Sequence, residues 1–155
     1  MHLGEVDILL VEDSLVDAEL ITEALIDSAL AHRLEYAHDG QEALNILQSR
    51  QDRPHLVLLD LNLPKVSGVE VLKTMRRDPK LRVVPVIILT NSQSQDDVAR
   101  CYANFCNAYV RKPLGFDKLA EVVKKMSEFW FKTATLPRSY VSLPPSSLVP
   151  PSKKK

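Results

Sequence analysis

The chain has 155 residues, of which 45% are hydrophobic and 26% are charged, proportions typical of a single globular domain. Its 20 basic and 20 acidic residues balance, so it lacks the basic excess that drives binding to nucleic-acid phosphates or to a membrane surface. The sequence has no apolar run long enough to span a bilayer and no leader of basic and then apolar residues, so we expect a cytoplasmic protein.

Strand-like and helix-like segments alternate along the chain. The sequence predicts strands at 6–11, 34–37, 56–59, 85–90 and 108–111, and helices at 15–30, 41–48, 69–77, 95–105 and 116–131. Because the strands are continuously apolar, we predict an α/β fold with a parallel sheet that helices cover on both faces. Ligands of such sheets bind at the carboxyl ends of the strands.

The composition changes after the last predicted helix. Residues 137–155 are rich in proline and serine and end in three lysines. Such a segment cannot continue a helix or build a second core, so we expect an extended tail and no output domain. The tail can drape over the domain or act as a docking peptide of the polyproline type, and the sequence does not separate these alternatives.

Two cysteines, Cys101 and Cys106, lie five residues apart in one predicted helix. This spacing separates them by about 140° around the helix axis, which suits neither a shared metal nor a disulfide. We therefore expect two buried, reduced thiols.

Polar residues stand at the carboxyl ends of four predicted strands. Glu12-Asp13 follows the first strand and Asp60 the third, Thr90 ends the fourth, and Lys112 follows the fifth. Neighbouring carboxylates repel each other unless a hard divalent cation joins them, and Mg2+ prefers oxygen ligands. An Asp nucleophile beside a metal, a hydroxyl and a lysine can accept a phosphoryl group by in-line attack. Taken alone, Glu12-Asp13 is equally compatible with a solvated turn or a helix N-cap.

Four segments, ILLVEDS, LVLLDLNLPKVSG, VIILTNS and AYVRKP, resemble the receiver domain of two-component response regulators over about residues 6–131. The segments LVDAELITEAL and EFWF are similar to the stand-alone regulators that work with cyanobacterial and bacterial phytochrome kinases. The resemblance implies a flavodoxin-like, doubly wound, five-stranded parallel sheet in the order 2-1-3-4-5 with five helices. Together with the change of composition at Pro137, it leads us to expect a receiver domain at 1–136 and a tail at 137–155.

The resemblance also implies a role for each metal-binding residue. Asp60 is the phospho-acceptor and a metal ligand, Asp13 binds Mg2+ directly, and Glu12 binds it mainly through water. Asn62, two residues after the acceptor, offers its backbone carbonyl to the metal.

Further roles follow from the same resemblance. Thr90 and Lys112 bind the phosphoryl oxygens, and Thr90 and Tyr109 form the switch that reports phosphorylation. Gly68 resembles the family's loop glycine, where a bulky side chain would crowd the turn before the third helix. Lys112-Pro113 resembles the family's Lys-Pro bond, which is commonly cis.

We therefore expect a single-domain response regulator that a sensor histidine kinase, with a phytochrome as one candidate, phosphorylates on Asp60. Without an output domain, the signal leaves through an unknown downstream protein or through self-association. Phe129, Trp130 and Phe131 cannot all be buried by one helical stripe, because neighbours lie about 100° apart. Either the tail covers the outward ring or the last helix and its neighbouring surface form a homodimer, which we favour.

Three alternative functions were considered, and two of them require residues that this sequence lacks. A haloacid dehalogenase-type phosphatase usually has a second Asp two residues after the nucleophile, where this chain has Asn62, which cannot act as a general acid. A flavodoxin-like mononucleotide site needs a loop rich in Gly, Ser or Thr after the first strand, where acids stand instead. An unphosphorylated scaffold receiver remains an alternative. We predict a signalling domain that at most catalyses its own phosphorylation and dephosphorylation.

Overall fold

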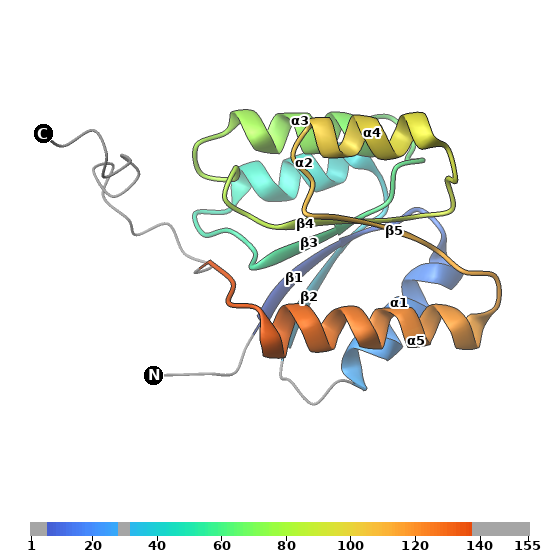
Figure 1. Ribbon diagram of the computed structural model, residues 1–155. Helices are drawn as coiled ribbons and strands as arrows, with labels where there is room; N and C mark the ends of the chain where they lie inside the picture. Colours follow the sequence, from blue (N-terminus) through green and yellow to red (C-terminus); the bar gives the residue numbers. More distant parts are fainter. Residues whose placement is uncertain (1–5, 28–31, 138–155) are drawn as a thin grey trace, which may run out of the picture.

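A computed structural model describes residues 6–27 and 32–137. Five strands form one parallel sheet in the order β2-β1-β3-β4-β5 (Figure 1). This order confirms the predicted flavodoxin-like topology, and the strand bounds lie within two residues of the prediction. The strands are β1 (Val6–Val11), β2 (His32–Ala37), β3 (Leu56–Leu59), β4 (Val86–Thr90) and β5 (Ala108–Arg111).

Helices cover both faces of the sheet, as Figure 1 shows. One face carries α1 (Leu15–Ile26) and α5 (Phe116–Ser127), and the other carries α2 (Gly40–Ser49), α3 (Gly68–Arg77) and α4 (Gln95–Ala103). Successive residues of a strand point to opposite faces, so Leu9 joins the core on one side and Ile8 and Leu10 the core on the other. Burial on both faces explains why the strands read as unbroken apolar runs.

Side-chain caps fix where four of the helices begin. Each capping oxygen accepts a hydrogen bond from the backbone N–H three residues later, which satisfies a donor that the helix leaves unpaired. The capping residues of α1 to α4 are Ser14, Asp39, Ser67 and Ser94. Because these caps follow the loops at the strand ends, the first turns of these helices stand at the same edge as the predicted site.

The structure corrects two predicted helix ends. Helix α4 stops at Ala103, and Phe105 adopts a left-handed conformation with φ of 66°, so Cys106 lies beyond the helix. The placement of both cysteines in one helix is therefore wrong, although Cys101 and Cys106 are buried free thiols as expected. The last helix changes after Ser127 into a π-helical segment, η1 (Glu128–Thr133), which contains the three aromatic residues.

The predicted tail at 137–155 lies outside the described residues beyond Pro137, as do residues 28–30 of the first predicted helix. None of the helices in the described ranges combines the length and the apolar character that a membrane-spanning segment requires.

Candidate functional site

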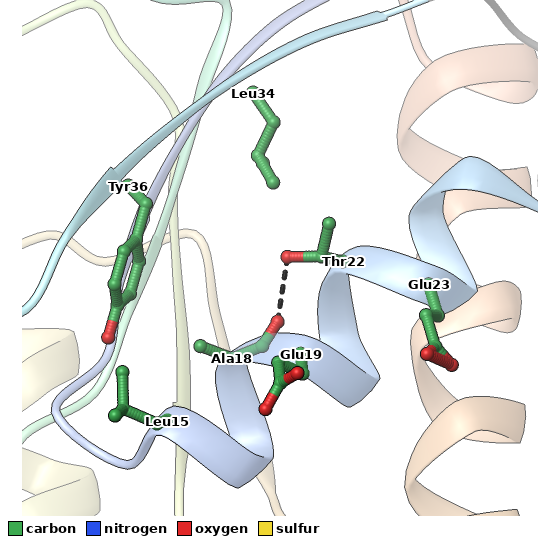
Figure 2. A pocket seen from close by; sticks show the side chains of 7 residues that line it. All are labelled: Leu15, Ala18, Glu19, Thr22, Glu23, Leu34 and Tyr36. Atoms are coloured by element: carbon green, nitrogen blue, oxygen red, sulfur yellow. Dashed lines mark hydrogen bonds between the residues drawn. The ribbon is translucent and has the colours of Figure 1, made fainter.

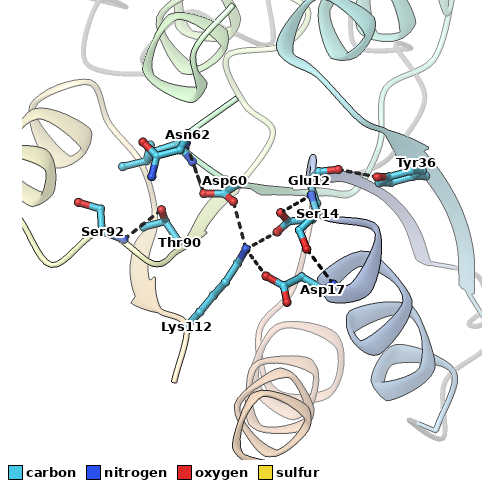
Figure 3. A network of polar contacts seen from close by, with 10 residues as sticks. Glu12, Ser14, Asp17, Tyr36, Asp60, Asn62, Thr90, Ser92 and Lys112 are labelled. Carbon is cyan, nitrogen blue, oxygen red and sulfur yellow. Dashed lines mark hydrogen bonds and ion pairs between the residues drawn. The ribbon is translucent and has the colours of Figure 1, made fainter. Parts of the chain in front are cut away.

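Asp60 lies at the carboxyl end of β3, in the centre of the polar network drawn in Figure 3. Its Oδ1 atom accepts hydrogen bonds from the backbone N–H groups of Leu61 at 2.7 Å and Asn62 at 3.4 Å. Its Oδ2 atom lies 3.1 Å from Lys112 Nζ. Since the side chain is only 7% exposed, these contacts hold the carboxylate in one orientation beneath the surface.

Glu12, Asp13 and Asp60 form an acid cluster at the ends of β1 and β3. Each offers a carboxylate oxygen, and these atoms lie within 4.8 Å of one another. Glu12 and Asp60 are buried, whereas Asp13 is exposed and opens the acid cluster toward solvent. Three oxygen donors at this spacing suit a hard divalent cation, which binds through oxygens and keeps part of its water shell. The donor set therefore fits the expected metal.

Lys112 follows β5 and is the cation within this network. Its Nζ atom donates to Glu12 Oε1 at 2.5 Å, to Asp17 Oδ2 at 2.9 Å and to Asp60 Oδ2 at 3.1 Å. The side chain is 2% exposed, so it is a buried ammonium group and not a surface lysine. The three contacts use all three of its N–H donors.

Asp17 is a site residue that the sequence analysis missed. It lies in the first turn of α1, and its backbone N–H donates to Ser14 Oγ at 3.2 Å. Acidic residues are common in first turns because they favour the helix dipole, so this position attracts no notice in a sequence. Its position in the sequence could have indicated this role, because a residue three positions after the N-cap of α1 lies at the same edge of the sheet as the strand ends.

The acids and the lysine shift each other's ionisation. Burial raises the pKa of Glu12 to about 7, and the charge of Asp60 adds to this rise, while the hydrogen bond from Lys112 opposes it. Burial alone lowers the pKa of Lys112, but the hydrogen bond to Glu12 and the charge of Asp60 outweigh it, so the net shift is upward. Burial sets the direction of the Glu12 shift, whereas the carboxylates around Lys112 set the direction of the Lys112 shift.

A second set of contacts runs through the loop after β4. Thr90 is fully buried, and its Oγ1 atom accepts the backbone N–H of Ser92 at 3.3 Å. The carbonyl of Ser92 accepts the hydroxyl of the half-buried Tyr109 at 3.0 Å, and the Ser92 hydroxyl donates to Asp97 Oδ2 at 2.5 Å. Ser92 thus connects Thr90 with β5 and with α4.

A family model described as a response regulator receiver domain matches residues 8–124. The chain belongs to the receiver domain family. Response regulator Rcp1 of Synechocystis sp. is 42% identical over 135 residues, which cover 84% of this receiver and 92% of Rcp1. The probable methanogenesis regulatory protein FilR2 of Methanothrix harundinacea is 43% identical over 127 residues, which cover 79% of this receiver and 82% of FilR2.

Two solved structures are similar to this receiver over nearly their whole length. The Mn(2+)-bound form of Rcp1 has a TM-score of 0.82 and 40% identity, with 86% of this chain and 99% of that chain covered. The phosphorylated cyanobacterial phytochrome response regulator RcpA has a TM-score of 0.84 and 41% identity, with coverage of 87% and 100%. The predicted resemblance to receivers, and among them to phytochrome regulators, is confirmed.

The sequence analysis made predictions for two loop positions of the receiver. The prediction that a side chain at position 68 would crowd the turn is confirmed, because a Cβ atom at Gly68 would lie 2.1 Å from the carbonyl oxygen of Asp60. The Lys112–Pro113 peptide bond differs from expectation: it is trans, and no described peptide bond is cis.

The three aromatic residues of η1 divide between core and surface. Trp130 and Phe131 pack against the core beneath α1 and α5, whereas Phe129 is 52% exposed. The rings of Phe129 and Trp130 meet edge to face, with centroids 5.2 Å apart. The prediction that at least one ring faces outward is confirmed for Phe129.

A groove of about 570 Å³ lies between α1 and β2, with Leu34 and Tyr36 on the strand side and Ala18 and Thr22 on the helix side (Figure 2). None of the side chains that line it belongs to the acid cluster. The Tyr36 hydroxyl donates to the carbonyl of Glu12 at 2.6 Å, which ties β2 to the backbone of the site.

Proposed function

We propose that this receiver is a phosphorylation-switched response regulator in which Asp60 takes a phosphoryl group from a sensor histidine kinase. Glu12, Asp13 and Asp60, together with the backbone carbonyl of Asn62, are proposed to bind Mg2+. The observation that carries the proposal is the setting of Asp60, whose two carboxylate oxygens face backbone N–H donors on one side and Lys112 on the other. The metal-bound form of Rcp1 and the phosphorylated form of RcpA support it.

In the proposed reaction, a carboxylate oxygen of Asp60 attacks phosphorus while the bond from phosphorus to the donor's histidine nitrogen breaks. The nitrogen keeps the electron pair, and Asp60 becomes an acyl phosphate. Bound Mg2+ supplies positive charge that offsets the acids and the phosphoryl oxygens. Lys112 and the Thr90 hydroxyl lie on the side of β4 and β5 and bind the remaining oxygens.

The surface around the site suits a protein donor. Four large apolar side chains at this edge of the sheet are more than half exposed, two at the start of α1 and two before and within α5. They are Leu15, Val16, Leu114 and Phe116. Exposed apolar side chains that flank a reactive carboxylate favour docking of another protein, and we propose that the kinase binds there. Since Rcp1 and RcpA are related regulators and RcpA is a phytochrome response regulator, a phytochrome kinase is the proposed partner class.

We propose that the output is a change of the surface formed by α4, β5 and α5. A phosphoryl group on Asp60 attracts the Thr90 hydroxyl, and movement of Thr90 must disturb its contact with Ser92 and, through Ser92, the Tyr109 hydroxyl. Each tenfold shift between the two states requires about 1.4 kcal/mol of differential contacts. A second receiver or a downstream protein then recognises the changed surface.

The decisive experiment follows phosphoryl incorporation. Wild type and Asp60→Asn are incubated with a small-molecule phosphodonor and Mg2+, and their intact masses are compared. We expect one phosphoryl group on wild type and none on Asp60→Asn, since the amide is not a nucleophile but keeps the shape of the side chain. Equal incorporation in both proteins would remove Asp60 from its role. Absence of incorporation in wild type, with phytochrome kinases as well, would favour the scaffold receiver.

The proposed homodimer uses α5 and η1, and its test centres on Phe129. Phe129→Ala removes the exposed ring without opening the core, whereas Trp130→Ala would also disturb packing. We expect Phe129→Ala to weaken dimerisation in sedimentation. Phe105→Ala is the matched control, because it removes an equally large exposed ring from a position outside α5 and η1. A dimer that is equally strong in all three proteins contradicts this surface.

A further inference from the structure

Asp17 is the acidic partner of Lys112 that stands outside the acid cluster. Lys112 Nζ donates to Glu12, Asp17 and Asp60, but only Glu12 and Asp60 also offer oxygens to the cation position. Figure 3 shows the Asp17 carboxylate on the α1 side of Lys112, with Asp60 on the β3 side. A bound metal would therefore compete with Lys112 for Glu12 and Asp60 but not for Asp17.

A divalent cation competes with Lys112 for two of these partners. When bound, the cation would attract the carboxylates of Glu12 and Asp60, and phosphorylation would convert Asp60 into an acyl phosphate. Lys112 is 2% exposed, and a buried ammonium group without an anionic partner is strongly disfavoured. Asp17 is the contact that neither event removes, so it can keep Lys112 in the pocket throughout.

The position of Asp17 suits this role. Its backbone is fixed by the cap contact with Ser14 and by the next residues of α1, Ala18 and Ile21, which are buried in the core. Its side chain is 23% exposed, so it is less desolvated than the side chains of Glu12 and Asp60. A carboxylate on a rigid helix turn is a fixed anchor for a long and otherwise flexible lysine side chain.

We propose that Asp17 is a positioning residue that holds the Lys112 ammonium group at the phosphoryl-binding position while the acid cluster binds Mg2+. The inference rests on the proposed phosphoacceptor function. Asp17 acts through Lys112 and contacts neither the metal nor the phosphoryl group.

The test substitutes Asp17→Asn, which keeps the size of the side chain and removes its charge. Lys112 then pairs more strongly with Glu12 and Asp60 and competes with the cation, so we expect Mg2+ affinity in calorimetry to fall about fivefold, as for the loss of one partly exposed ion pair. In the Mg2+-saturated protein, NMR should show faster hydrogen exchange of the Lys112 ammonium group. The phosphorylation rate with a small phosphodonor should fall by a similar factor.

Two further variants separate positioning from charge. Glu19→Gln removes the same charge from an exposed position of the same helix, and no contact between Glu19 and Lys112 is described, so it should change each quantity less than twofold. Asp17→Glu keeps the charge with a longer reach and should restore slow exchange of Lys112. Urea unfolding in the absence of metal verifies that every variant is folded. If Asp17→Asn unfolds, Asp17→Ser serves in its place.

Identical Mg2+ affinity and Lys112 exchange in Asp17→Asn and Glu19→Gln would overturn the positioning role. Failure of the proposed function has a different signature. Wild type would take up no phosphoryl group on Asp60, yet Lys112 exchange in the Mg2+-bound protein would still depend on Asp17.

Discussion

Substitution of Gly68 by alanine tests how closely the turn before α3 packs against Asp60, the proposed phosphoacceptor. A Cβ atom at this position would lie 2.1 Å from the carbonyl oxygen of Asp60 and 2.7 Å from the Cα atom of Leu61. Comfortable non-bonded contacts of carbon need about 3.5 Å, so the backbone after β3 must move by more than about 1 Å. No side chain can rotate to relieve the clash, because both opposing atoms are backbone. We expect Gly68→Ala to lower the free energy of unfolding by about 3 kcal/mol.

The assay is urea unfolding followed by circular dichroism, with the slope m as a check that the unfolded state is unchanged. Gly115→Ala is the matched control. Gly115 has a φ of 95°, and no atom lies within 4 Å of the position that a Cβ atom would occupy, so its substitution costs about 1–2 kcal/mol of backbone strain without crowding. Only Gly68→Ala should move the backbone amide signals of Leu61 and Asn62. A Gly68→Ala protein within about 0.5 kcal/mol of wild type, with those signals unmoved, would refute the reasoning.

Two further predictions concern the opposite edge of the sheet. Burial holds the pKa of His55 below its usual value, and the imidazole Nδ1 accepts the backbone N–H of Asp7 at 2.8 Å, which requires the neutral ring. The unfolded chain binds this proton more readily, so stability should fall as pH drops below about 6.5, and urea midpoints of His55→Asn should show a weaker fall. Arg50 lies 2.5 Å from the buried carboxylate of Asp7, and Arg50→Met should cost about 3 kcal/mol in thermal or urea unfolding because that charge loses its close partner. A loss below about 1 kcal/mol would mean that the exposed Arg33, 3.6 Å away, suffices.

The strand ends were predictable from the sequence because a parallel sheet converts order along the chain into position. Strands buried on both faces read as unbroken apolar runs, and their carboxyl ends meet at one edge. Hence Glu12, Asp60, Thr90 and Lys112 could be expected to lie together from the sequence alone. The sequence could not show in which direction each side chain points. The Lys112 side chain also reaches α1, and only the folded chain reveals Asp17 as its third partner.

The helix ends were less predictable, since small backbone preferences decide them. Phe105 adopts a left-handed conformation that a bulky residue rarely takes, so no residue pattern indicated that α4 ends before Cys106. The change to η1 after Ser127 likewise depends on how Trp130 and Phe131 reach the core. A π-helical turn rotates less per residue than an α-helical one, which lets two large neighbouring rings share the buried side while Phe129 stays outside.

The charges of the site explain why the proposed function calls for a metal as well as Lys112. Glu12, Asp17 and Asp60 contact one ammonium group, and Asp13 adds a further carboxylate to the acid cluster. The pocket therefore carries an excess of negative charge before any phosphoryl group arrives. Burial raises the pKa of Glu12 to about 7, and the charge of Asp60 adds to this rise. A second lysine would bring only one positive charge, whereas a divalent cation brings two and binds through several oxygens. In the proposed function, Lys112 would then remain with Asp17 and be available to the phosphoryl oxygens, so that the two cations would divide the carboxylates between them.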